Sequence, residues 1–302
     1  MIQNKKVLVT GGAGFIGSNL VDKLIELGNK VIVIDNQSAN SNDKFHWNNK
    51  AQNYTHDICD YDNIKHLFKG VNYVFHLAAE ARIQPTLENP ILAAKTNTVG
   101  TCTILQCAKE ANVDRVIYSS TSSAYGLKNP TPLTEDAPND CLNPYSVTKA
   151  SGEDLCKMYT DLFGLKTIIF RYFNVYGPRE PLKGAYAPLI GIFLRKLKAN
   201  EPLTIVGDGE QRRDFTHVND VVDANIKAAA VKHDAADGET INVGTGKNYS
   251  VNEIAKMVGG PIINIPQRGG EARETLASNT RLKAWLDCSP KDRLEEYING
   301  NR

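Results

Sequence analysis

The chain has 302 residues, of which 41% are hydrophobic and 23% charged, and its formal net charge is +1. These values are typical of a folded globular protein, and they exclude a disordered chain and an overall basic one of the kind that binds nucleic acid. No apolar run approaches the about 20 residues of a membrane helix, and no apolar signal segment precedes the first strand-like run. We therefore expect a cytoplasmic protein with no nucleic-acid or membrane partner.

Short β-branched apolar runs alternate with amphipathic stretches through the first part of the chain. Helices are predicted at 18–28, which ends at Gly28, and at 99–113. The runs predicted as strands are 5–10, 30–35, 73–79, 114–120 and 166–174. This alternation predicts an α/β fold with a Rossmann-type doubly wound parallel sheet.

The alternation stops after Tyr176, where glycines and prolines cluster. A helix-like run follows at 189–201, and the run 239–246 predicts one more strand that returns to the sheet. A returning strand means that two domains are interleaved in the sequence. We predict a nucleotide-binding Rossmann domain at 1–175 and 216–247, and a smaller C-terminal substrate domain at 176–215 and 248–302.

A glycine-rich turn, TGGAGFIG at 10–17, lies between the first predicted strand and the first helix. Glycines at this place allow a tight turn and let backbone N–H groups approach a pyrophosphate at the helix N-terminus. Asp35 ends the second predicted strand, where a carboxylate can accept hydrogen bonds from an adenosine ribose. Because a carboxylate repels a 2′-phosphate, the predicted cofactor is NAD rather than NADP.

Tyr145 and Lys149 form a pair in the segment NPYSVTK, which reads as the start of a helix. Residues four apart share one helix face, and a nearby ammonium together with an oxidised nicotinamide favours the phenolate of a tyrosine. A tyrosine packed under a lysine stem is the alternative interpretation. The hydroxyl-rich segment SSTSSAYG at 119–126 favours chemistry, because Thr121 can hydrogen-bond a substrate oxygen that Tyr145 deprotonates.

These motifs together resemble the extended short-chain dehydrogenase/reductase family, in its NAD-dependent sugar-nucleotide epimerase and dehydratase branch. The chain is most similar there to UDP-glucose and UDP-N-acetylglucosamine 4-epimerases. Besides the motifs above, the resemblance is carried by HLAA at 76–79, RYFNVYGPR at 171–179, GDGEQRRDFTHVND at 207–220 and RGGE at 268–271. It implies that Tyr145 takes the proton of the sugar 4-hydroxyl while hydride moves to NAD, and that Lys149 binds the nicotinamide ribose.

The resemblance also implies two sets of binding residues. The predicted NAD-binding residues are Gly11, Gly14, Phe15, Ile16, Gly17, Asp35, Asn36, Asp57, Ile58, Ala78, Ala79, Asn97, Tyr145, Lys149 and Tyr172. The predicted residues for the UDP-sugar are Arg82, Thr121, Ser122, Ser123, Tyr145, Asn174, Arg213, Arg268 and Glu271. For Arg213, an ion pair with the adjacent Asp214 is the alternative interpretation.

The segment Thr121-Ser122-Ser123 indicates which branch of the family applies. Dehydratases of this family resemble Thr-Asp-Glu here, and serine hydroxyls are far too weak for those acid and base roles. The sequence therefore predicts a 4-epimerase. A small Thr275 permits an N-acetyl group on the sugar, whereas Arg82 departs from the epimerase pattern and leaves a UDP-uronic acid epimerase, a decarboxylase or another sugar-nucleotide oxidoreductase open. A non-catalytic NAD-binding module is the third alternative.

The six histidines show no metal-ligand spacing, so no metal site is predicted, and the six cysteines show no CxxC pair, which predicts reduced thiols. The resemblance implies a homodimer. Its paired helices would be the amphipathic stretches at 90–111 and 146–163, although the same apolar faces could belong to an intramolecular core.

Overall fold

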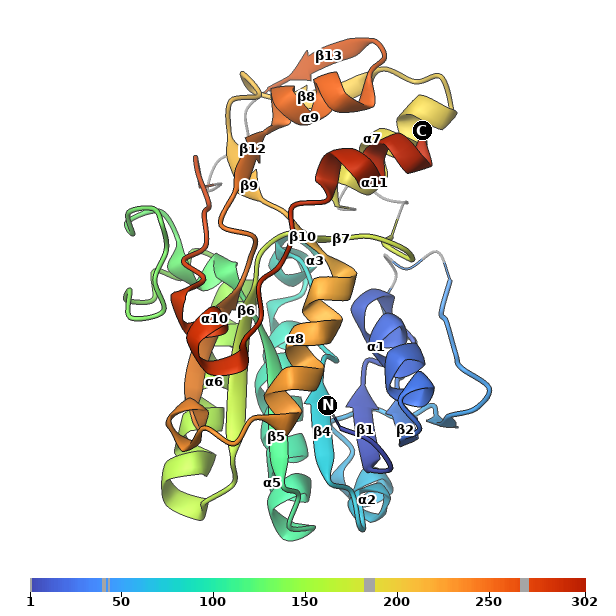
Figure 1. The fold of residues 1–302 in the computed structure, drawn as a ribbon, viewed down its shortest axis with the longest axis vertical. Coiled ribbons are helices and arrows are strands. Elements are labelled where there is room, and N and C mark those ends of the chain that lie inside the picture. Colours follow the sequence, from blue (N-terminus) through green and yellow to red (C-terminus); the bar gives the residue numbers. More distant parts are fainter. Residues whose placement is uncertain (1, 40–41, 43, 182–187, 267–271) are drawn as a thin grey trace.

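A seven-stranded, fully parallel sheet forms the lower half of the molecule in Figure 1. The computed structural model describes residues 2–39, 42, 44–181, 188–266 and 272–302. Across the sheet the order is β11 (Glu239–Val243), β6 (Thr167–Tyr172), β5 (Arg115–Thr121), β4 (Tyr73–His76), β1 (Lys6–Thr10), β2 (Lys30–Ile34) and β3 (Gln52–Tyr54). The predicted doubly wound parallel sheet is confirmed.

All six runs predicted as strands lie in this sheet. The prediction and the structure differ only in short or irregular elements and in where two helices begin and end. The polar edge strand β3, with the sequence QNY, was not predicted. Helix α1 (Phe15–Glu26) begins three residues earlier than predicted, because the extended Gly14 is its N-cap. Helix α5 (Thr101–Glu110) is shorter than the predicted 99–113 and continues from a π-helical segment, η2 (Lys95–Gly100).

Each central strand is buried on both faces, which is why its sequence is a continuous apolar run. Val7 and Val9 of β1 face the core shared with α1, α8 (Val218–Ala230) and α10 (Thr280–Leu286). Leu8, between them, faces the opposite core, which contains side chains of α2 (Tyr61–Ile64), α5 and α6 (Pro144–Phe163). The period-two alternation of a strand thus divides one apolar run between two cores.

A second assembly with its own core lies above the sheet in Figure 1. Three helices enclose it: α7 (Leu189–Lys198), α9 (Val251–Val258) and α11 (Leu294–Asn301). Three two-stranded pairs belong to this end of the molecule, namely β7 (Val175–Tyr176) with β10 (Thr216–His217), β9 (Arg212–Asp214) with β12 (Asn248–Ser250), and β8 (Leu203–Val206) with β13 (Ile262–Ile265). The chain therefore leaves the sheet after β6, returns through α8 and β11, and leaves again; the exact domain limits stay a prediction.

The remaining described elements are short connections around the sheet. They are η1 (Lys65–Phe68), α3 (Ile83–Glu88), α4 (Pro90–Ala94), η3 (Ser122–Tyr125) and η4 (Asp234–Ala236). Within the described ranges, no helix combines the length and the apolar character needed to cross a bilayer.

Helix α6 is fixed firmly at its start and along its buried face. The Asn143 side chain accepts a hydrogen bond from the Ser146 amide at 2.9 Å in a capping box, and Pro144 occupies the first turn. Further along, Arg171 of β6 binds Glu153 with two parallel hydrogen bonds, Nε to Oε1 at 2.9 Å and Nη2 to Oε2 at 2.6 Å. Tyr145 and Lys149 lie between these two anchors, so the helix presents them in a defined position.

Candidate functional site

A cavity of about 1200 Å³ lies at the carboxyl ends of the strands and extends to the second core. This is the edge where ligands bind in doubly wound folds. It brings together most of the predicted site residues: Gly11, Gly14, Phe15, Ile16, Gly17, Asp35, Asn36, Ile58, Ala78, Ala79, Arg82, Thr121, Ser122, Ser123, Tyr145, Lys149, Tyr172, Asn174 and Arg213. Predicted residues from separate strands and helices thus share one site.

Two predicted residues within the described chain, Asp57 and Asn97, are not among those that line the cavity. Asp57 accepts a hydrogen bond from the Cys59 amide at 2.8 Å. Asn97 is buried and joins the loop after β4 to α6, since its Nδ2 donates to the Glu80 carbonyl and to the Thr148 hydroxyl at 3.0 Å. Asn97 therefore supports the wall of the cavity from behind. Arg268 and Glu271 lie outside the described residues.

The glycines of the first turn form a cradle that side chains would fill. A Cβ on Gly17 would lie 2.1 Å from the Gly11 carbonyl oxygen, and a Cβ on Gly11 would lie 2.7 Å from the Ala78 amide nitrogen. Gly14 caps α1 without any side-chain hydrogen bond, so the first N–H groups of the helix are not covered by a capping side chain. A pyrophosphate can approach these backbone groups closely.

Asp35 stands beside this cradle at the end of β2. Its Oδ2 accepts from the Ala13 amide at 3.0 Å and its Oδ1 from the Gln37 amide at 2.9 Å. Burial raises the pKa of this carboxyl, and the backbone hydrogen bonds oppose the increase. A carboxylate accepts up to about four hydrogen bonds, so Asp35 retains acceptor positions for ribose hydroxyls. The cradle and Asp35 together fit the adenosine diphosphate half of NAD.

Replacing Gly17 by alanine is expected to weaken NAD binding by about tenfold to a hundredfold. The new methyl group would meet backbone atoms of Gly11 and Gly12, which cannot move aside cheaply, and overpacking of this kind costs about 1–3 kcal/mol. Titration calorimetry with NAD, on protein first freed of retained cofactor, measures the effect. Gly300→Ala is the matched control, because nothing lies within 4 Å of the added methyl group; equal NAD affinity of the Gly17 variant and the wild type would contradict the cradle.

Tyr145 and Lys149 lie in the cavity wall at the other end, on neighbouring turns of α6. The Lys149 Nζ lies over the ring of Tyr118, 4.2 Å from its centroid, and the Tyr118 hydroxyl donates to the Lys149 carbonyl. Burial lowers the pKa of Lys149 to about 7. Tyr118 was not predicted as part of the site, because its place in an apolar strand sequence gives no signal of this contact.

The protein groups by themselves leave the pKa of Tyr145 above its usual value. Burial raises this pKa, while the Thr121 hydroxyl and the positive charge of Arg82 lower it. Thr121 ends β5 and also accepts from the Ser123 amide at 3.1 Å. The predicted ionisation at neutral pH therefore depends on the positive nicotinamide as well, since the cations of the chain do not offset burial.

Two polar strand-end residues, His76 and Tyr172, form buried hydrogen bonds at this edge of the sheet. His76 is enclosed by the Thr10 and Thr101 hydroxyls, at 2.7 Å and 3.0 Å from its ring nitrogens, and burial lowers its pKa to about 3. Both ring nitrogens of His76 therefore have hydrogen-bond partners within the protein. Tyr172 lines the cavity and places its hydroxyl between Ser119 and Asn225.

The part of the cavity next to the second core contains Asn174 and Arg213, two of the residues predicted for the UDP-sugar. Asn174 donates to the Asp214 carbonyl at 2.9 Å, and Arg213 follows on β9. The Asp214 carboxylate accepts from Thr245, Gly246 and Ala277, and it forms no ion pair with Arg213, both residues being described. Thr275 also lines this part.

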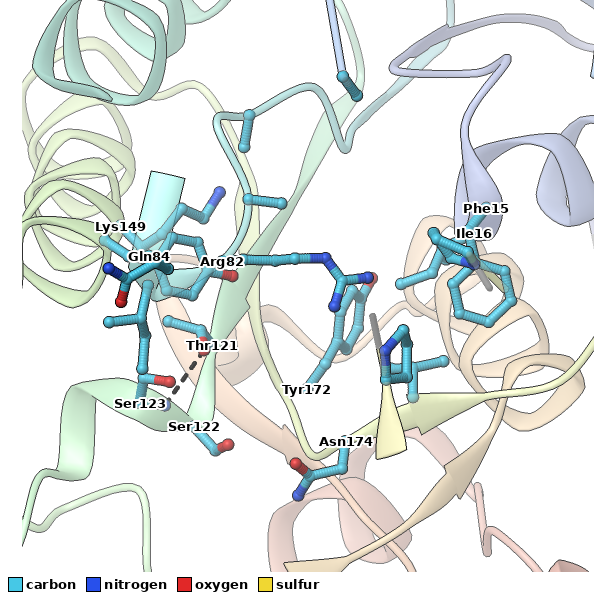
Figure 2. Close-up of a pocket in the computed structure, with 18 of the residues that line it drawn as sticks. Phe15, Ile16, Arg82, Gln84, Thr121, Ser122, Ser123, Lys149, Tyr172 and Asn174 are labelled. Carbon is cyan, nitrogen blue, oxygen red and sulfur yellow. Dashed lines mark hydrogen bonds between the residues drawn. The ribbon is translucent and has the colours of Figure 1, made fainter. Parts of the chain in front are cut away.

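Figure 2 shows how the side chains lie around the cavity. Ser122 and Ser123 follow Thr121 on one side, and Phe15 and Ile16 of α1 lie on the other. Arg82 extends between these two sides from the loop after β4, toward Tyr172. Within the described part of the chain, no cluster of three or more histidine, cysteine, aspartate or glutamate side chains is placed to hold a metal ion.

The chain was also compared with known proteins. Residues 7–244 match the model of the NAD dependent epimerase/dehydratase family. A relative described as a putative UDP-glucose 4-epimerase from Methanocaldococcus jannaschii is 41% identical over 254 residues, which cover 83% of this chain and 81% of the relative.

Three solved structures have the same fold. UDP-glucose 4-epimerase from Thermotoga maritima, with UDP-glucose, is 36% identical with a TM-score of 0.91, covering 98% of this chain and 97% of that one. UDP-N-acetylglucosamine 4-epimerase from Methanobrevibacter ruminantium, in complex with UDP-N-acetylmuramic acid, is 32% identical with a TM-score of 0.92, covering 99% and 97%. UDP-glucuronic acid 4-epimerase from Bacillus cereus, with UDP-glucuronic acid and NAD, is 31% identical with a TM-score of 0.87, covering 98% and 97%.

Proposed function

The chain belongs to the NAD dependent epimerase/dehydratase family, and from this premise we propose that it inverts the configuration at C4 of the sugar in a UDP-sugar. The observation that carries the proposal is one shared cavity. It joins the glycine cradle and Asp35 to Tyr145, Lys149 and Thr121, while serines rather than acids follow Thr121.

NAD, when bound, supplies the oxidant that accepts a hydride from C4 and later returns it. Gly11, Gly14 and Gly17 would hold its pyrophosphate, and Asp35 the adenosine ribose. Tyr145 would remove the proton of the 4-hydroxyl and give it back after the 4-keto sugar has turned over. Thr121 would hydrogen-bond the same oxygen, and Lys149 would bind the nicotinamide ribose.

The residues after Thr121 support epimerisation over dehydration. Removal of water across C5 and C6 needs a carboxylate base and a carboxylic acid, and Ser122 and Ser123 supply neither at neutral pH. For the substrate we propose UDP-glucose or UDP-N-acetylglucosamine, with Asn174 and Arg213 at the diphosphate. The small Thr275 in the cavity wall is compatible with an N-acetyl group.

An acidic sugar is the second candidate, because Arg82 places a positive charge in the cavity. A guanidinium suits a carboxylate, which a UDP-uronic acid epimerase or decarboxylase would bind. The two candidates share NAD as cofactor and Tyr145 as the base, and they differ in the substrate.

The test is to incubate the purified protein without added cofactor with UDP-glucose, UDP-N-acetylglucosamine and UDP-glucuronic acid separately, and to follow the anomeric protons by NMR. A galacto-configured product from one of the first two would support the proposal and rank them. Conversion of UDP-glucuronic acid alone, or release of CO2, would favour the second candidate. Absence of any product, even with added NAD, would contradict both and favour a non-catalytic module.

We also propose that the protein forms a homodimer through α4, η2 and α6. Ile91, Val99 and Leu162 lie on these elements and are 82%, 53% and 70% exposed, and exposed apolar patches mark interfaces. Ile91→Glu is expected to shift the protein from dimer to monomer in light scattering coupled to size exclusion. A monomeric wild type would contradict the dimer.

A further inference from the structure

Asn225 places an amide group inside the apolar core between the sheet and α8. It is fully buried, and its neighbours Ala224 and Ile226 both belong to that core. Its Nδ2 donates to the Val221 carbonyl and to the Tyr172 hydroxyl, both at 2.8 Å, whereas its Oδ1 has no partner among the described residues. A buried polar side chain in an apolar core requires an explanation. The contact with Tyr172 connects Asn225 to the cavity, because Tyr172 lines the cavity wall (Figure 2).

The orientation of the Asn225 amide is fixed by these contacts. Only its NH2 end can face the Val221 carbonyl, because a flipped amide would place its oxygen against another acceptor. Both Nδ2 hydrogens are then used, one on the Val221 carbonyl and one on the Tyr172 oxygen. The Tyr172 oxygen is therefore an acceptor in this contact, and its own hydrogen has another direction.

The Tyr172 hydroxyl donates this hydrogen to Ser119 of β5. The two hydroxyl oxygens lie 3.0 Å apart, and Ser119 and Asn225 are the only hydrogen-bond partners of this hydroxyl within the described ranges. Burial raises the pKa of Tyr172 to about 12, so the hydroxyl keeps its proton at neutral pH. Because an amide NH2 accepts no hydrogen bond, Ser119 must accept it. The three side chains form a hydrogen-bond relay from Asn225 through Tyr172 to Ser119.

Ser119 is the end of the relay that faces the cavity. It lines the cavity together with Tyr145 and Lys149, two residues before Thr121 on β5. Its oxygen accepts from Tyr172, so its hydrogen is directed elsewhere, and in the described part of the chain Ser119 has no second partner for its hydroxyl. This hydrogen is available to an acceptor in the cavity.

We propose that Ser119 donates a hydrogen bond to the carboxamide oxygen of the NAD nicotinamide, and that Asn225 is a positioning residue that directs this donor through Tyr172. The carboxamide oxygen is the strong acceptor of the nicotinamide, because the ring nitrogen is bonded to ribose and has no free lone pair. A serine fixed as a donor selects the oxygen over the amide NH2 and restricts rotation of the ring. This inference deepens the proposed 4-epimerase function and rests on NAD as its cofactor.

The test is titration calorimetry with NAD and with ADP-ribose, on protein first freed of retained cofactor. ADP-ribose keeps both riboses and the pyrophosphate but lacks the nicotinamide. Ser119→Ala is expected to weaken NAD binding by about three- to tenfold, the effect of one neutral hydrogen bond, and to leave ADP-ribose binding unchanged. Ser278→Ala is the matched control, because it removes an exposed hydroxyl away from the cavity lining.

Asn225→Asp tests the relay, because it reverses the direction of the hydrogen bonds at nearly constant shape. The buried acid stays protonated, donates to the Val221 carbonyl and accepts from Tyr172. Tyr172 then accepts from Ser119, whose hydrogen turns away from the cavity. This variant is expected to weaken NAD binding as much as Ser119→Ala, to leave ADP-ribose binding unchanged, and to add nothing in the double variant. Tyr172→Phe interrupts the relay without placing an acid in the core, and it is expected to weaken NAD binding in the same direction.

A merely structural role of Asn225 would weaken both ligands alike, and its effect would add to that of Ser119→Ala. Equal NAD affinity of Ser119→Ala and wild type would overturn the proposal, as would equal weakening of NAD and ADP-ribose. If thermal unfolding shows that Asn225→Asp does not fold, unchanged NAD affinity of Tyr172→Phe would overturn the relay. Since the titrations contain no sugar, a negative result here leaves the proposed epimerisation to be judged by its own NMR test.

Discussion

Replacing Tyr145 by phenylalanine is expected to reduce kcat about a thousandfold while NAD stays bound. The substitution removes only the hydroxyl that would carry the proton of the sugar, and general acid–base catalysis contributes about a hundred- to ten-thousandfold. The ring remains in the cavity wall, and the glycine cradle and Asp35 are untouched. Single-turnover kinetics, together with the absorbance of the retained cofactor, measure both parts of the prediction.

Tyr159→Phe is the matched control on the same helix. Its hydroxyl donates to Gln106 at 2.9 Å, away from the cavity lining, so turnover should stay within about twofold of wild type. A Tyr145→Phe protein that keeps more than about a tenth of the wild-type kcat would exclude Tyr145 as the main base. Loss of NAD in that variant would instead show that the tyrosine mainly holds the cofactor.

Removing the carboxylate of Glu153 is expected to lower the free energy of unfolding by about 3–5 kcal/mol. Glu153 and Arg171 are 1% and 3% exposed as side chains, so the change leaves the guanidinium buried without its counter-ion. One Arg171 nitrogen, Nη1, already has no hydrogen-bond partner. The Ser120 hydroxyl, which donates to the same carboxylate, also loses its acceptor.

Urea denaturation of Glu153→Ala measures this loss, and Glu26→Gln is its control. Lys23 and Glu26 form an ion pair of similar length on the surface, 49% and 64% exposed, and such pairs contribute about 0–1 kcal/mol. If the free energy of unfolding of the Glu153 variant falls as little as that of the control, the buried ion pair is not what holds α6 against the sheet.

The sheet could be predicted because its signal is local. Strands buried on both faces need continuous apolar runs, and β1, β2, β4, β5, β6 and β11 all have them. The edge strand β3 was missed because two of its three residues are exposed and polar. It is held by pairing with β2 rather than by its own side chains.

The same holds for the site: residues in short motifs could be predicted, whereas contacts between distant segments could not. The glycine cradle, Asp35, and the pair of Tyr145 with Lys149 are motifs of a few residues, so their meeting in one cavity followed from the order of the strands. The contact of Tyr118 with Lys149 depends on how β5 packs against α6, and no spacing in the sequence encodes that. Asn97 shows the converse, because the resemblance implies that it binds NAD, whereas it packs behind the cavity instead of lining it.

The path of the chain between the sheet and the second core restricts how such a protein can acquire a new specificity. The second core takes residues from both before and after α8 and β11. A single genetic crossover therefore cannot exchange that core for another one, since it would separate α7 and β8 from α9 and β13. Point substitutions along the cavity wall, by contrast, leave this path of the chain unchanged.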